Sequence, residues 1–144
     1  MNNEDTIHLT KECNAGIKMA IESINEVLDH VQTTNFKQIL ERSKKEHDKI
    51  QEKTHDFLAY LGEEEKEPNP MAKGMSWLKT NIKLTMKDSD ATAADLITEG
   101  CNMGVKTLRK YLNQYPAADE KAKEIAKQVI EVEKKLTDDI SIYL

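Results

Sequence analysis

The sequence predicts an all-α protein, and three observations support that prediction. Charged residues make up 33% of the 144-residue chain and hydrophobic residues 38%, a balance typical of solvated helices. With only five glycines and three prolines, few positions interrupt a helix. Apolar residues recur at spacings of three and four, the period of a helix with one buried face. A chain of this length can bury a core without disulfides, so we expect one domain.

The first half of the chain predicts a helical hairpin over residues 5–62. Its first helix runs from about Asp5 to Val31, and its second follows a cap among Thr33 to Asn35 and ends at Gly62. The inward positions of the first helix are Ile7, Thr10, Asn14, Ile17, Ile21, Ile24, Leu28 and Val31. Those of the second are Phe36, Leu40, Ser43, His47, Ile50, Thr54, Phe57 and Leu61.

The second half predicts another hairpin, over residues 90–143. Ser89 or Asp90 caps a helix that runs to about Gln114, and Pro116 is expected to start the last helix. The inward positions of the first of these helices are Ala94, Ile97, Cys101, Leu108, Leu112 and Tyr115. Those of the last are Ala122, Ile125, Val129, Val132, Leu136, Ile140 and Tyr143.

The connection between the hairpins carries a helix of its own. Asn69 can cap it and Pro70 can occupy its first position, which predicts a short helix over residues 71–86. At about 1.5 Å per residue, such a helix can return the chain along most of the bundle. Two hairpins joined by a long crossover are the topology of a ferritin-like bundle. We therefore expect residues 1–144 to form a ferritin-like four-helix bundle with a fifth, short helix in the crossover.

One short pattern, Cys-Asn-x-Gly, occurs twice, at residues 13–16 and at residues 101–104. It suggests either a duplicated active site or a duplicated scaffold, in which small residues let helices approach and a cysteine is buried. Duplication of an ancestral hairpin would place the pattern on the first and third helices of the bundle. The scaffold interpretation is favoured, because free cysteine is among the most buried residue types.

Four features suggest a family: the Cys-x-x-Gly elements at Cys13 and Cys101, "FLAYLG" at the end of the second helix, and "GMSWLK" in the crossover. With these, the chain resembles an uncharacterised family of small bacterial ferritin-like four-helix-bundle proteins. The resemblance covers nearly the whole chain and implies a fold, but it brings no established activity. Because the wider ferritin-like group includes iron oxidases and peroxide-handling enzymes, a metal site has to be tested on the residues themselves.

A di-iron site of the ferritin type needs one Glu from each of two helices and a Glu-x-x-His from each of the other two. The chain contains one such motif, Glu52 to His55, but its helical phase places both side chains opposite the apolar stripe. Three further glutamates also lie away from the stripes: Glu12, Glu22 and Glu99. The ligand set is incomplete, so we expect no catalytic residue and no bound metal, with a degenerate di-iron protein as an alternative.

A second possible metal site lies in the middle of the predicted bundle. Its candidate ligands are Cys13, Glu46, His47 and Cys101. Two thiols and an imidazole could bind zinc or iron with one further ligand, or form a redox pair. A single histidine in a helix seam is more often a hydrogen-bonded core residue, and this structural interpretation is favoured.

The crossover helix predicts a surface for self-association. It carries lysines without an acidic residue, and its main apolar stripe can pack on the bundle. Trp77 and Leu84 lie on the opposite side, and tryptophan is a common anchor of interfaces. We therefore expect a homodimer with these two residues in its interface.

Net charge, hydropathy and the cysteines restrict the expected location and partners of the protein. A net charge of -5 makes nucleic acid an unexpected partner, and no apolar run is long enough for an integral membrane protein. A polar start without a signal peptide and two cysteines without CxxC spacing favour a cytoplasmic protein with reduced thiols. We predict a non-enzymatic ferritin-like interaction or stress-related module. The alternative is a metal-binding or redox protein that uses the central Cys and His residues.

Overall fold

The computed structural model describes residues 3–63 and 89–144. This part of the chain consists of helices: α1 (Glu4–Leu28), α2 (Thr34–Tyr60), α4 (Asp90–Gln114), α5 (Glu120–Ile140) and a short 3-10 helix, η1 (Ser141–Tyr143). The all-α prediction is therefore confirmed for the described residues, as is a bundle of four long helices. The predicted crossover helix over residues 71–86, with Trp77 and Leu84, lies outside them.

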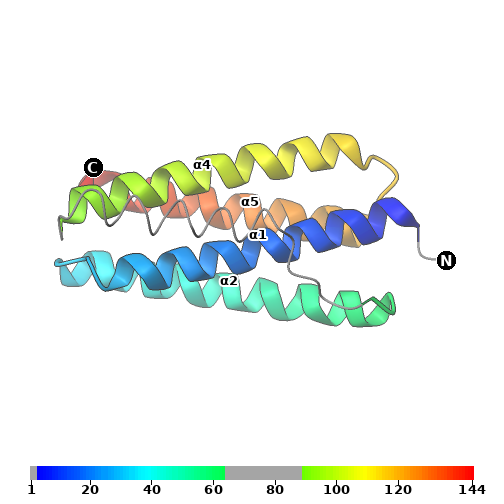
Figure 1. The fold of residues 1–144 in the computed structure, drawn as a ribbon, viewed down its shortest axis with the longest axis horizontal. Coiled ribbons are helices and arrows are strands. Elements are labelled where there is room, and N and C mark those ends of the chain that lie inside the picture. Colours follow the sequence, from blue (N-terminus) through cyan, green and yellow to red (C-terminus); the bar gives the residue numbers. More distant parts are fainter. Residues whose placement is uncertain (1–2, 64–88) are drawn as a thin grey trace.

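The four helices form two antiparallel hairpins that pack side by side (Figure 1). α1 contacts both α2 and α4, α5 contacts the same two helices, and α1 also reaches α5 across the diagonal. Glu63 binds Lys11 near the start of α1 (3.0 Å), whereas Asp90 binds the backbone of Gln32 beyond its end (2.7 Å). The chain thus leaves the first hairpin at one end of the bundle and enters the second at the other. α2 and α4 run in the same direction, in the helix order that the sequence predicted.

The helix ends follow the predicted capping in most places. Ser89 caps α4 as predicted, by accepting a hydrogen bond from the Thr92 backbone (3.1 Å). Asn3, for which no cap was predicted, caps α1 in the same way. Gly62 has a φ of 74°, the left-handed conformation expected of a glycine at a helix end. Serine, asparagine and glycine are the residues that these positions favour.

The start of the last helix differs from the prediction. α5 begins at Glu120, not at Pro116. The intervening turn is held by tertiary hydrogen bonds: the Ala117 backbone N–H donates to the Asp5 carboxylate (3.0 Å), and the Asp119 N–H donates to the Thr6 hydroxyl (2.8 Å). These contacts to α1 fix the segment as a turn, although proline is compatible with a helix start.

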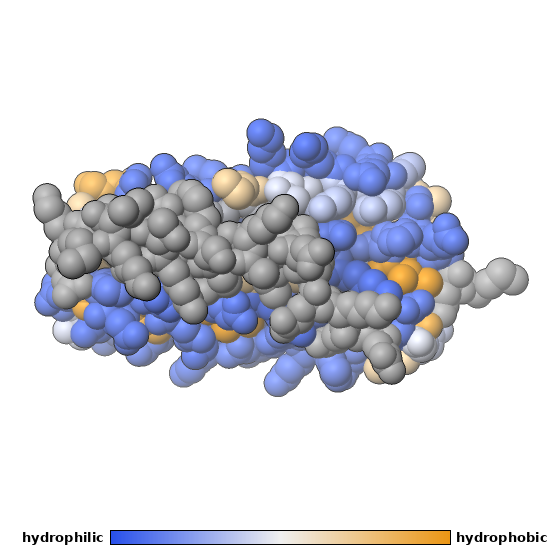
Figure 2. All heavy atoms as spheres, viewed as in Figure 1, coloured by the Kyte–Doolittle hydropathy of each residue, from blue (hydrophilic) through white to orange (hydrophobic). Residues whose placement is uncertain are grey.

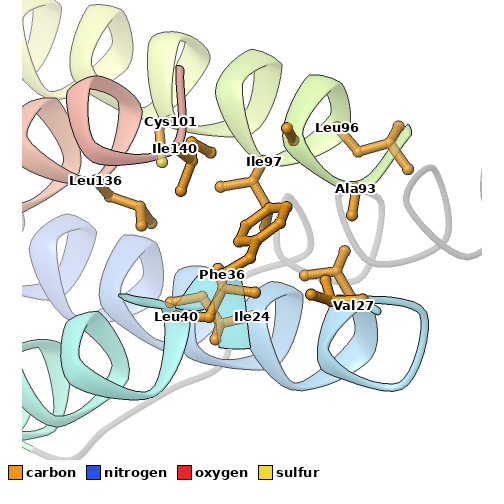
Figure 3. Packing of buried hydrophobic residues seen from close by; sticks show 12 residues of the cluster. Ile24, Val27, Phe36, Leu40, Ala93, Leu96, Ile97, Cys101, Leu136 and Ile140 are labelled. Carbon is orange, nitrogen blue, oxygen red and sulfur yellow. The ribbon is translucent and has the colours of Figure 1, made fainter. Parts of the chain in front are cut away.

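The hydrophobic core is divided into two clusters along the bundle. The α1–α2-turn cluster lies at the end where α1 passes to α2, and in Figure 3 the Phe36 side chain of α2 points toward Ile97 of α4. Its members are Ile24, Val27, Val31, Phe36, Leu40, Ala93, Ala94, Leu96, Ile97, Cys101, Leu136 and Ile140. The α4–α5-turn cluster occupies the other end and comprises Leu9, Cys13, Ile17, Phe57, Leu61, Leu108, Ala118, Ala122, Ile125, Ala126, Val129 and Ile130.

The outer surface is mostly hydrophilic on the face that Figure 2 shows, with small hydrophobic areas among the described residues. None of the helices in residues 3–63 and 89–144 combines the length and the apolar character that a bilayer-spanning helix requires. The apolar side chains of these helices are instead packed mainly in the two clusters.

Candidate functional site

His47 lies on the inner face of α2, and its side chain is 0% exposed. Its ring nitrogen Nδ1 is 2.8 Å from the backbone oxygen of Ser43. Because a carbonyl oxygen only accepts, Nδ1 carries the hydrogen and Nε2 keeps a lone pair. Nε2 has no hydrogen-bond partner among the described residues. Burial lowers the pKa of His47, against the opposing effects of Ser43 and the neighbouring acids, so the ring is neutral at pH 7.

Glu133 is a buried carboxyl group on α5, with 4% exposure. Its Oε2 atom has no hydrogen-bond partner within the described residues. Burial raises the pKa of Glu133 to about 8, so the group is protonated and uncharged at neutral pH.

Gly104 on α4 leaves room for the Glu133 side chain. A Cβ atom built on Gly104 would lie 2.7 Å from Oε2 and 3.1 Å from Oε1 of Glu133. These distances are shorter than ordinary contacts, so the carboxyl group occupies the space that any other residue at position 104 would fill. The second Cys-Asn-x-Gly pattern thus has a structural role in accommodating a buried acid.

Two contacts between α2 and α5 show that His47 and Glu133 lie at the same level of the bundle. Lys135 binds Glu46 (Nζ–Oε1 3.2 Å), and Lys53 binds Gln128 (Nζ–Oε1 3.1 Å). The step along α2 between these contacts equals the step back along α5, as in a regular antiparallel pair. His47 is therefore opposite the residue that follows Glu133. We call His47, Glu133 and Gly104 the polar layer; it separates the two hydrophobic clusters.

The two cysteines do not join this layer as a pair. Cys13 belongs to the α4–α5-turn cluster and Cys101 to the α1–α2-turn cluster, and both are free and buried. Burial raises the pKa of Cys13 to about 12, with a smaller effect of Glu12. Burial, followed by the charge of Glu133, raises the pKa of Cys101 as well. Both thiols are protonated at neutral pH, and the structure does not bring them together.

The other candidate ligands are also apart. Glu46 is on the surface of α2, where it forms an ion pair with Lys135. Glu52 and His55 are exposed, as their helical phase predicted. Within residues 3–63 and 89–144, no three His, Cys, Asp or Glu side chains are grouped so that they could hold a metal ion.

Glu133 was not among the residues predicted from the sequence, although the sequence contains a signal for it. Its position continues a regular series of steps of four and three along the last helix: Ala122, Ala126, Val129, Glu133, Leu136 and Ile140. Val132 was predicted to face inward instead. Both residues are buried. The apolar pattern is satisfied by Val132, and it therefore gave no reason to place Glu133 in the core.

Comparison with protein-family models, curated proteins and solved structures finds no match. The resemblance to a ferritin-like family therefore stays a prediction.

An open groove of about 850 Å³ lies on the outside of the bundle between α2 and α5. Ile50 and Val132 supply its apolar atoms. The rims carry both signs of charge: Glu46, Lys49 and Lys53 on α2, and Glu124, Lys127, Glu131 and Lys135 on α5. This mixed pattern suits a partner with the same mixture of charges, because each sign can meet its opposite.

Proposed function

We propose that this protein is a non-enzymatic interaction module with a ferritin-like bundle. The observation that carries the proposal is the state of the reactive side chains in the described core: Cys13, His47 and Cys101 are buried and uncharged. A protonated, buried thiol is a poor nucleophile and a poor metal ligand, because both roles require the thiolate. The helix order, with two hairpins entered from opposite ends, supports the ferritin-like part of the proposal.

The partner that we propose is a second copy of the chain. In the groove between α2 and α5, Ile50 and Val132 offer an apolar contact, and the rims hold lysines and glutamates on both helices. A twofold dimer places the same surface of both copies together, so a surface with both charges can be complementary to itself. The sequence predicts a different dimer surface, around Trp77 and Leu84, and the two surfaces can be tested separately.

Sedimentation of charge-reversal variants tests the self-association. Lys49→Glu combined with Lys127→Glu removes positive charge from both rims, and we expect it to convert the dimer to a monomer. Lys45→Glu combined with Lys121→Glu makes the same change of charge at exposed positions outside the groove and should leave the dimer intact. A wild-type monomer at tens of micromolar would contradict the homodimer. Loss of the dimer only in Trp77→Ala with Leu84→Ala would move the interface to the crossover.

Metal analysis tests the non-enzymatic part of the proposal. Protein purified without chelators and without a metal-affinity column should contain less than stoichiometric iron or zinc. Stoichiometric metal would contradict the proposal and favour the metal-binding alternative.

A further inference from the structure

We propose that His47 and Glu133 act together as a pH switch, which holds α2 against α5 while both side chains are uncharged. The switch concerns the folding of this chain alone and does not depend on the proposed partner.

The geometry of the polar layer places a donor and an acceptor on facing helices. The protonated Glu133 carboxyl group offers an O–H, and the neutral His47 ring offers the lone pair of Nε2. Each side chain has one buried polar atom without a partner in the described residues, and both lie at the same level of neighbouring helices. While both are uncharged, one water molecule between them can accept from the Glu133 O–H and donate to Nε2 of His47.

Either charge would disturb this arrangement. Ionised Glu133 would be a buried carboxylate without a donor, and protonated His47 would turn its free acceptor into a second donor. A buried charge without a partner is costly, because the protein replaces little of the lost hydration. The Glu133 carboxyl group occupies the space that the missing side chain of Gly104 leaves on α4.

The titratable groups around Glu133 come from three helices. Cys101 on α4 is near enough for the charge of Glu133 to affect its titration. On α2, His47 is at the same level, and Glu46 is held by Lys135. On α1, the contacts Asp5–Ala117 and Gln32–Asp90 fix the register with α4 and place the half-buried Lys18 level with Gly104.

The two groups make stability depend on pH in opposite directions. The pKa of Glu133 is raised from 4.5 to about 8, so its contribution is fully present below 4.5 and is lost as the pH rises to 8. The pKa of His47 is lowered from 6.5, so its contribution is present above 6.5 and is lost as the pH falls. Between pH 4.5 and pH 6.5, the ordinary pKa values of the two groups, the effects of Glu133 and His47 on stability oppose each other. From about pH 6.5 to 8, only the loss from Glu133 remains.

Urea unfolding followed by circular dichroism, at pH values from about 5 to about 9, tests the switch. In the wild type, the unfolding equilibrium constant should rise about tenfold per pH unit between pH 6.5 and 8, because folding takes up one proton there. Glu133→Gln keeps the shape of the side chain and should abolish this rise. Glu131→Gln removes an exposed carboxylate from the same helix and should retain it. His47→Gln removes the opposing effect of the histidine, so the stability of this variant should keep rising as the pH falls from 6.5 to 5, where the wild type should change little.

Two results would overturn the proposal. One is a Glu133→Gln protein with the same pH dependence as Glu131→Gln. The other is strict additivity of Glu133→Gln and His47→Gln, since residues that act as a pair should couple in a double-mutant cycle. If Glu133→Gln fails to fold, carboxyl-carbon NMR of the wild type replaces it. A Glu133 midpoint near 8 supports the switch, and a midpoint near the ordinary 4.5 contradicts it.

Discussion

Gly104 and Glu133 fit together because Gly104 has no side chain, and the Glu133 carboxyl group occupies the space that a side chain would fill. At the two other helical glycines described, Gly16 and Gly100, an added Cβ atom would have no described atom within 4 Å. The two Cys-Asn-x-Gly patterns are therefore not equivalent in this respect, since only the second glycine accommodates a buried acid. The pattern recurs in the sequence, but its physical role depends on the residue that faces it.

Replacing these glycines should have opposite effects on stability. Gly104→Ala forces the Glu133 carboxyl group to move within a packed core and should cost about 1–3 kcal/mol. Gly100→Ala, on the exposed side of the same helix, should stabilise the protein by about 0.5–1 kcal/mol, because alanine loses less backbone entropy in a helix. Urea unfolding at one pH measures both. Equal effects at the two positions would show that Glu133 does not occupy the space beside Gly104.

The buried and the exposed histidine of α2 should also differ. His47→Ala removes a fully buried ring and should lower the free energy of unfolding by about 1–3 kcal/mol. His55→Ala alters an exposed side chain and should change it by less than about 0.5 kcal/mol. Thermal or urea unfolding of the two variants gives the comparison. A larger loss for His55→Ala would mean that α2 is rotated from the position described.

At the scale of the helices, side-chain contacts tie the turns of one hairpin to the ends of the other. The Asp90 carboxylate at the start of α4 accepts hydrogen bonds from the backbone N–H groups of Gln32 (2.7 Å) and Thr33 (3.2 Å) and from the Thr33 hydroxyl. Desolvation raises the pKa of Asp90, but these bonds outweigh it and hold the pKa below its ordinary value of 3.8. The sequence predicted Ser89 or Asp90 as a cap; it could not show which turn Asp90 would meet.

Removing this carboxylate should loosen the contact between α4 and the α1–α2 turn. Asp90→Ala should cost about 1 kcal/mol at neutral pH, the usual net contribution of a hydrogen bond. Because the pKa of Asp90 is lowered, its contribution is present above 3.8 and is lost as the pH falls through the folded-state pKa. Asp95→Ala, an exposed acid on the same helix, is the matched control. Urea unfolding should show no excess loss for Asp90→Ala if the carboxylate does not hold the turn.

For the whole molecule, the spacing of apolar residues was enough to predict the four long helices and their order. It identified His47 as a core residue, because position 47 continues the stripe of α2. It did not separate Cys13 from Cys101, since a helical period gives the face of a residue and not its level along the bundle. It missed Glu133 because Val132 offered an apolar residue one position away. The first failure concerns the register between helices and the second the rotation of one helix in the bundle. Both follow from packing rather than from any one segment.

The proposed function rests on a bundle that encloses its reactive side chains, and thiol labelling measures that enclosure. With Ellman-type reagent, Cys13 and Cys101 should react slowly in the native protein and rapidly after denaturant, because both are buried and protonated. Cys13→Ala and Cys101→Ala variants assign the two rates. Slow native labelling of both thiols is the predicted result. Fast labelling of both in a protein whose far-UV circular dichroism stays helical would mean that the folded bundle does not enclose its thiols.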